Sequence, residues 1–390
     1  MKITIVEDAK IIVSNRAGIH NYFGWPTVAK LPDGSLAAVS SGMRARHVCP
    51  FGKVTMSLSR DEGKSWTRPM ILIDTPLDDR DAGIAVSGER VIVTSFNNTI
   101  KQQRDRNADS HQIQYHPGNR RPTLYSKEEL NACTKGYIEE YLNSVDAESA
   151  ERDFLGSLYI VSEDGGYTFG DIKKIPVTAP HGPSVAPDGR FVYVGTTFNP
   201  EGGNDNNLAC YVEGDDGEFY LAGKIEDVGF AYGKEVCSCE PHCLVLPDGK
   251  IIVHIRVQSE PGENEDHSSI FTLYQSESTD GGKTFTKPHL IVDDINCGAP
   301  AHLLRLKNGT IISAFGYRSE PYGIKVICSF DEGKSWSEPC MIYNNNSIAL
   351  DIGYPSSVEL ENGDILTVFY ARPEEGAPAE IMQVVWKFEE

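Results

Sequence analysis

Residues that could carry acid–base or anion-binding chemistry recur at two positions of a repeating pattern in this 390-residue sequence. Both positions flank short apolar runs that meet at turns of the Asp-Gly type. Before these turns stand Trp25, Asp81, His181, Glu240, His242, His302 and Tyr354, and after them stand Arg44, Arg46, His47, Arg256 and Arg318. Carboxylates and imidazoles transfer protons, and guanidinium groups bind carboxylates through paired hydrogen bonds. A fold that gathers these groups would build a functional site.

Six such turns divide the chain into units. They are Asp33-Gly34, Ser87-Gly88, Asp188-Gly189, Asp248-Gly249, Asn308-Gly309 and Asn362-Gly363. Their glycines lie 54 to 60 residues apart, except for one gap of 101. Turns of this type join β-hairpins, and the continuous apolar runs beside them suit strands buried on both faces. Six units of about four strands predict an all-β fold, a six-bladed β-propeller.

A second repeat, the Asp box, has the pattern S-x-D-x-G-x-[ST]-[WF] and interleaves with the first. Its four clear copies are 59–66, 162–169, 278–285 and 329–336. The aspartate can hydrogen-bond the backbone of its own tight turn, the glycine can take a positive φ, and the aromatic can plug the hairpin base.

The hairpin pattern also places the polar residues. The strand before each turn begins, and the strand after it ends, at the face opposite the turn. We therefore expect the residues named above to converge on one rim of the central channel. Ligand sites are concave, so this rim is the expected place for a functional site.

The long gap contains an insertion in the second blade. We expect residues 98–152 to form a loop followed by one helix at 127–143, within a single domain spanning 1–390. The insertion would act as a lid, as a contact in a homo-oligomer, or as simple packing over an edge.

The composition excludes several classes of protein. The net charge of −20 disfavours nucleic acid and anionic membrane surfaces as partners, and no apolar run approaches the about 18 residues of a membrane span. Nine irregularly spaced cysteines behind an acidic, non-secretory N-terminus predict free thiols in the cytoplasm. Cys237, Cys239, His242 and Cys243 lack the spacing of a structural zinc site, so we expect no metal and no cofactor.

The Asp-box repeat, the six turns and the rim residues together resemble the sialidase (neuraminidase) superfamily of BNR-repeat propellers. The resemblance implies that Tyr354, in Gly353-Tyr354-Pro355, is a nucleophile activated by Glu240, and that Arg256 and Arg318 clamp a sugar carboxylate. A neutral phenol suits attack beside that carboxylate, which would repel an anionic nucleophile.

The chain departs from this family at two points. Trp25-Pro26-Thr27 stands where the family has its first clamp arginine, and the loop 43–53 lacks the family's acid/base aspartate. Arg44 or Arg46 would replace the arginine, and His47 or Asp81 would replace the proton donor. Trp25 and three histidines, His181, His242 and His302, would complete the substrate contacts.

The resemblance thus implies an exo-acting glycoside hydrolase for an acidic sugar or oligosaccharide, including uronic and keto-sugar acids. Two alternatives stay open. One is a polysaccharide lyase or non-sialidase glycosidase that uses His47 with Tyr354. The other is a glycan-binding propeller without catalysis.

Overall fold

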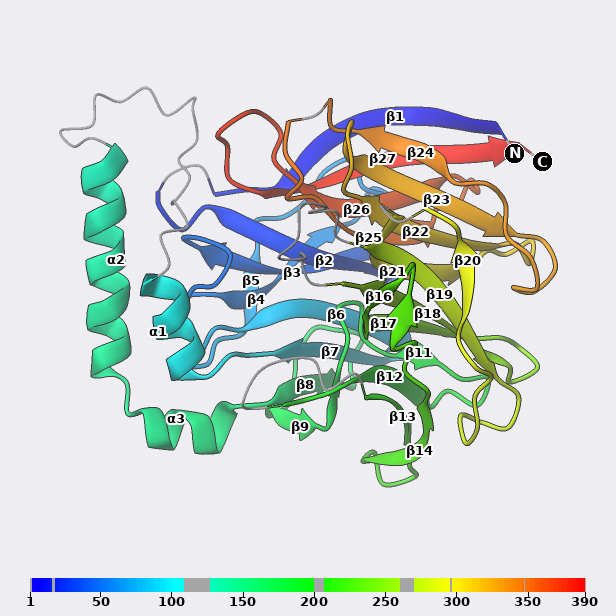
Figure 1. Ribbon diagram of the computed structural model, residues 1–390, viewed down its shortest axis with the longest axis horizontal. Helices are drawn as coiled ribbons and strands as arrows, with labels where there is room; N and C mark the ends of the chain where they lie inside the picture. The colour runs from blue at the N-terminus through cyan, green and yellow to red at the C-terminus, as the bar shows by residue number, and fades with distance from the viewer. Residues whose placement is uncertain are drawn as a thin grey trace.

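The computed structural model describes residues 2–15, 18–108, 127–199, 207–259, 270–294, 297–346 and 348–389. The fold is the six-bladed β-propeller that the repeats predict (Figure 1). Blade 1 contains β2 (Tyr22–Lys30), β3 (Leu36–Arg44), β4 (Lys53–Ser59) and β5 (Met70–Ile73), and blade 2 contains β6 (Arg80–Ser87), β7 (Arg90–Phe96), β8 (Ser157–Ser162) and β9 (Lys173–Ile175). Blade 3 contains β10 (Val177–Thr178), β11 (Ser184–Val185), β12 (Phe191–Thr197), β13 (Leu208–Glu213) and β14 (Phe219–Ile225).

The second half of the chain repeats this arrangement. Blade 4 contains β17 (Cys237–Val245), β18 (Ile251–Gln258), β19 (Phe271–Ser278) and β20 (His289–Val292), and a small hairpin of β15 (Phe230–Ala231) and β16 (Lys234–Glu235) precedes it. Blade 5 contains β21 (Cys297–Arg305), β22 (Ile311–Tyr317), β23 (Gly323–Ser329) and β24 (Cys340–Asn344). Blade 6 contains β25 (Gly353–Glu359), β26 (Ile365–Ala371) and β27 (Glu380–Glu389).

The N-terminal strand completes the last blade. β1 (Lys2–Val13) pairs antiparallel with β27, with Ile5 opposite Trp386, so the two ends of the chain share one sheet (Figure 1). Ring closure is therefore made by backbone hydrogen bonds between the first and last strands.

Both repeats have the local geometry that their residues predict. All six turn glycines have positive φ, from 59° at Gly88 to 93° at Gly309. In the first Asp box, Asp61 accepts hydrogen bonds from the backbone and hydroxyl of Ser65 at 2.9 and 2.6 Å. The aromatic of the box then reaches the preceding blade, since Trp66 Nε1 donates to Gln383 in β27 at 2.8 Å. The Asp boxes therefore fasten each turn and tie neighbouring blades together.

The hydrophobic core lies between the blades. One cluster joins Leu31 and Val39 of blade 1 to Ile84 and Val93 of blade 2. This explains the continuous apolar runs, because each central strand is covered on both faces.

The insertion in blade 2 contains more helix than the sequence predicts. The expected helix is α2 (Lys127–Ser144), but α1 (Ile100–Ala108) and α3 (Ala147–Phe154) flank it, and 109–126 lie outside the described residues. The sequence does not predict α1, because this helix is mostly polar and contacts the hydrophobic core of the insertion through few residues, Ile100 among them. The helices cover the loop after β3 through Ile138 and Leu142. Of the helices described, none is long and apolar enough to cross a membrane.

Candidate active site

Four residues of the predicted rim occupy equivalent β-bulges in the innermost strands. Trp25, Asp81, Glu240 and Tyr354 have φ values of 53°, 40°, 46° and 50°, and each lies at a register shift in its strand pair. A left-handed backbone costs a non-glycine residue about 1–2 kcal/mol. Bulges re-aim side chains beside active sites, and such strain persists where the surrounding structure enforces it. The bulges therefore orient these four side chains at a cost in the stability of the fold.

The bulges of blades 4 and 6 bring Tyr354 and Glu240 together. Tyr354 Oη donates to Glu240 Oε1 at 2.7 Å, and Arg256 forms an ion pair with Glu240 Oε2. Burial, and secondly the charge of Glu240, raise the pKa of Tyr354 well above its ordinary value. The phenol is therefore neutral at rest, and the Glu240 carboxylate stands where it would accept the proton during attack. Arg256 thus orients this carboxylate, and its contact with a sugar carboxylate stays a prediction.

Asp81 lies near this pair and is only 7% exposed. Burial raises its pKa to about 7, against the opposing charge of Arg80, and the Glu240 carboxylate adds to the rise. Among the described residues, Asp81 Oδ1 has no hydrogen-bond partner. Asp81 and Glu240 both line a cavity of about 320 Å³. Asp81 is thus a carboxyl group that holds its proton near neutral pH.

A larger cavity of about 960 Å³ opens beside the first, and both are lined by Asn98 and Gln102. Arg318 lines it and donates from Nε to Ile352 O and from Nη2 to Tyr370 Oη, both at 3.1 Å. Arg372 also lines it, in an ion pair with Asp351 at 2.9 Å. The Tyr354 side chain lines neither cavity, although its hydroxyl contacts Glu240.

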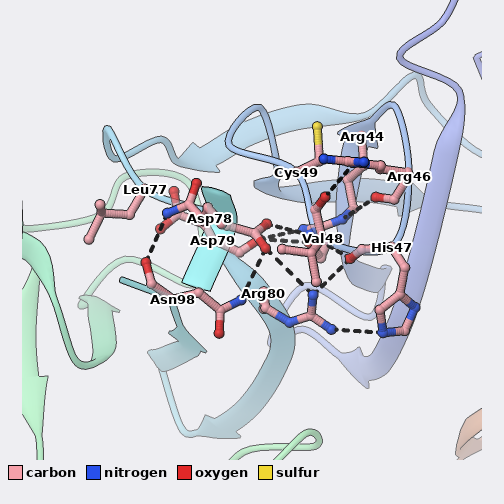
Figure 2. A network of polar contacts seen from close by, with 12 residues as sticks. Arg44, Arg46, His47, Val48, Cys49, Leu77, Asp78, Asp79, Arg80 and Asn98 are labelled. Atoms are coloured by element: carbon pink, nitrogen blue, oxygen red, sulfur yellow. Dashed lines mark hydrogen bonds and ion pairs between the residues drawn. The ribbon is translucent and has the colours of Figure 1, made fainter. Parts of the chain in front are cut away.

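His47 lines the larger cavity and is held there by arginines (Figure 2). Its carbonyl accepts from Arg80 at 2.7 Å and from Arg44 at 2.8 Å, and its Nε2 lies 3.3 Å from Arg80 Nη2. Its Nδ1 lies 3.4 Å from Tyr22 Oη. The ring is open to the cavity but otherwise enclosed, and desolvation together with the neighbouring arginines lowers its pKa well below the ordinary value. His47 is therefore a neutral imidazole that could accept a proton.

The Arg44 side chain lies buried behind the loop that carries His47. Its side chain is 0% exposed and forms an ion pair with the equally buried Asp78 (Figure 2). It also donates to Ser41 Oγ at 2.7 Å. The Arg44 guanidinium braces the loop that carries His47 and lines neither cavity, so substrate binding by Arg44 stays a prediction. Arg46 does line the larger cavity, where it hydrogen-bonds Asn107 of α1.

Trp25 is also covered by protein. It is 1% exposed, with the Arg80 guanidinium 4.4 Å from its ring centre and the His47 ring 4.9 Å away. Trp25 therefore supports Arg80 and His47 from within the core, and its contact with substrate stays a prediction.

The three rim histidines form a buried cluster. His242 and His302 stack at 4.6 Å, and His181 packs against both. His242 Nδ1 accepts from Leu303 N at 3.0 Å, so its proton is on Nε2, and burial lowers its pKa to about 3. These neutral rings fill the space between blades, and their contact with substrate stays a prediction. No cluster of three or more metal-ligating side chains occurs among the described residues.

The sequence does not predict several residues of the larger cavity. Arg80, Arg106, Tyr22 and Tyr370 either line it or contact residues that do, and Arg372 lines it as well. Arg372 carries a usable signal, since it follows the sixth turn at the same spacing at which Arg318 follows the fifth. Arg106 has no such signal, because the insertion brings it to the site.

Comparison with known proteins places this architecture in a family. The model of the BNR repeat-like domain matches residues 143–367, more than half of the chain. No curated protein matches the chain in sequence.

Solved structures share the fold at low sequence identity. A protein of unknown function from Dyadobacter fermentans aligns with a TM-score of 0.70 and 18% identity, over 99% of each chain. The NanB sialidase of Streptococcus pneumoniae aligns with a TM-score of 0.60 and 14% identity, over 97% of this chain and 70% of its own. The intramolecular trans-sialidase of Ruminococcus gnavus, solved with oseltamivir carboxylate, aligns with a TM-score of 0.56 and 14% identity, over 96% of each chain. The chain belongs to the BNR repeat-like domain family and has the sialidase-like six-bladed propeller fold.

Proposed function

We propose that this protein is an exo-acting glycoside hydrolase for carboxylate-bearing sugars, with Tyr354 as nucleophile and Glu240 as its base. The observation that carries the proposal is the 2.7 Å hydrogen bond from Tyr354 Oη to Glu240 Oε1. A nucleophile held against a base by a short hydrogen bond is the arrangement that covalent catalysis needs.

The proposed reaction has two steps. Tyr354 Oη bonds to the anomeric carbon while Glu240 takes the phenolic proton, and the glycosidic C–O bond breaks as an acid protonates the leaving oxygen. Water then attacks the anomeric carbon and gives a proton back to the acid that protonated the leaving oxygen, the bond to Tyr354 breaks, and Tyr354 recovers its proton from Glu240. Glu240 thus serves as base and then as acid.

Asp81 is the proposed acid for the leaving group. Its pKa of about 7 keeps much of it protonated at neutral pH, and it lines the same cavity as Glu240. His47 suits this role less well, because its lowered pKa leaves it without the proton to give.

Arg318 is the proposed partner of the sugar carboxylate. Its contacts are to a carbonyl and a phenol rather than to an acid, so it keeps its positive charge available in the larger cavity. Arg372 stands in the same lining and would assist it. The trans-sialidase of R. gnavus binds oseltamivir carboxylate on the same fold, which supports a carboxylate-bearing ligand here.

The test is Tyr354→Phe, assayed on a panel of aryl glycosides of sialic, uronic and keto-sugar acids. We expect turnover to disappear while the unfolding temperature changes little. Tyr159→Phe is a matched control, because this buried phenol in blade 2 has no hydrogen-bond partner among the described residues. Full activity in Tyr354→Phe would reject the nucleophile, and binding without turnover in the parent protein would indicate a glycan-binding propeller.

One observation favours a second candidate, a lyase. His47 is a neutral base open to the cavity, within 3.4 Å of the Tyr22 hydroxyl. It could remove the proton next to a uronic acid carboxylate, and elimination would leave a sugar with a carbon–carbon double bond. Ultraviolet absorbance of the product distinguishes this reaction from hydrolysis.

We also propose a reducing compartment, the cytoplasm, as the site of action. All eight cysteines whose side chains are described are free thiols, and Cys49, Cys210, Cys239, Cys243 and Cys328 are buried. Measuring the thiol content of the protein as isolated from its host would test this.

A further inference from the structure

The larger cavity is strongly basic in a chain with a net charge of −20. Five arginines line it, against a single carboxylate, Asp351; they are Arg46, Arg80, Arg106, Arg318 and Arg372. Clustered positive charge in a low-dielectric cleft concentrates anions there. The cavity therefore attracts anions, although the negative net charge of the whole protein repels them.

Two of the five arginines already form ion pairs with carboxylates. Arg372 is paired with Asp351 at 2.9 Å, and Arg80 lies 3.5 Å from Asp78. Arg46, Arg106 and Arg318 have no carboxylate partner within the described ranges. The lining thus contains three cations without a counter-charge, two more than a single carboxylate would balance.

These three cations come from three parts of the fold. Arg318 follows β22 of blade 5, Arg106 lies on α1 of the insertion, and Arg46 lies in the loop after β3 of blade 1, where it hydrogen-bonds Asn107 on α1. His47 lines the same cavity. Arg46 is only 5% exposed, and a buried cation is costly unless an anion accompanies it.

We propose that Arg46 and Arg106 form a second anion subsite, so that the ligand carries at least two negative groups, such as an acidic oligosaccharide or a sugar acid with a further carboxylate, sulfate or phosphate. The inference rests on the proposed function for the first carboxylate, which Arg318 binds. The volume of about 960 Å³ is at the upper end for ligand sites and has room for more than one sugar ring. The insertion therefore contributes to substrate choice through α1.

The test uses ligands that cannot be cleaved. Affinities of succinate, adipate and suberate are compared by calorimetry with those of butyrate, hexanoate and octanoate at one fixed ionic strength, because salt screens exposed charges. We expect at least one dicarboxylate to bind about tenfold or more tightly than its monocarboxylate partner, as one charge-assisted contact allows.

Variants assign this preference to the subsite. Arg106 is exposed on α1, so Arg106→Ala should fold normally and reduce the affinity of the dicarboxylate several-fold more than that of the monocarboxylate. Lys101→Ala removes the same charge from the same helix but from outside the cavity, and should keep the preference. Equal affinity for both ligand series, or equal loss of both in Arg106→Ala, overturns the inference. Turnover is not measured here, so loss of the Tyr354 mechanism would leave this result standing.

Discussion

Replacing Asp81 by Asn tests the electrostatics of the site through stability. The carboxyl is buried, one of its oxygens lacks a partner among the described residues, and its pKa is raised from 3.8 to about 7. Asparagine has nearly the same shape and tolerates the left-handed backbone at this position. The substitution therefore removes the ionisation without disturbing the bulge.

The direction in which pH changes the stability follows from proton linkage. A carboxyl with a raised pKa in the folded state binds more protons there than in the unfolded chain, so its ionisation destabilises the fold as the pH rises from 3.8 to about 7. The rise of the Asp81 pKa by about three pH units corresponds to a loss of about 4 kcal/mol of unfolding free energy above pH 7. At about pH 5 less than half of this penalty has accumulated.

We therefore expect Asp81→Asn to gain stability on going from pH 5 to pH 8, by about 2–3 kcal/mol relative to the parent protein. Urea unfolding at a series of pH values measures this, and any pH-independent cost of the substitution cancels in the comparison. Asp171→Asn, at an exposed position, changes the net charge equally and serves as the control. Parallel pH curves for the parent and Asp81→Asn would refute a buried carboxyl with a raised pKa.

Three further predictions concern the surroundings of the site. Arg44→Met removes the ion-pair partner of the buried Asp78 and should lower the unfolding free energy by about 3 kcal/mol. Adding Asp78→Asn should recover part of this loss. An unchanged unfolding free energy in urea would contradict the buried ion pair. Glu240→Gln should lower kcat by about 100-fold or more with little change in KM, and unchanged kcat would exclude Glu240 as the base. Gly83→Ala would place a Cβ 2.3 Å from the backbone of blade 3 and should cost about 1–3 kcal/mol in thermal unfolding, whereas Gly136→Ala on α2 meets no atom within 4 Å and should be neutral or stabilising.

The sequence predicts the fold well because its signals are local. The glycine of each hairpin turn and the serine, aspartate and aromatic of each Asp box act within a few residues, so their spacing determines where strands end. The neighbourhood of Tyr354 and Glu240 also follows, since equivalent places in different blades converge on one rim.

The orientation of rim side chains does not follow from the sequence. A bulge in each inner strand breaks the regular alternation of the strand, so His242, two residues after Glu240, lies buried among the other histidines. Arg44 points into the core because Asp78, from another blade, compensates its charge there. α1 carries a weak apolar signal and is held by side-chain hydrogen bonds, so the place of Arg106 in the cavity depends on tertiary contacts.

The pairing of β1 with β27 has a consequence for how the chain folds. The outer strand of blade 6 is made before every other strand of the ring, but its partner appears only after the other five blades. Until then β1 is an unpaired edge that can recruit other strands, including those of a second molecule. Because the two ends meet in one sheet, a short linker joining them with new ends opened at a hairpin turn should give a circularly permuted protein with the same ring. Moving the break to a turn such as Gly249 would make that sheet from consecutive strands and should speed folding, since less of the chain must be closed before the ring is complete.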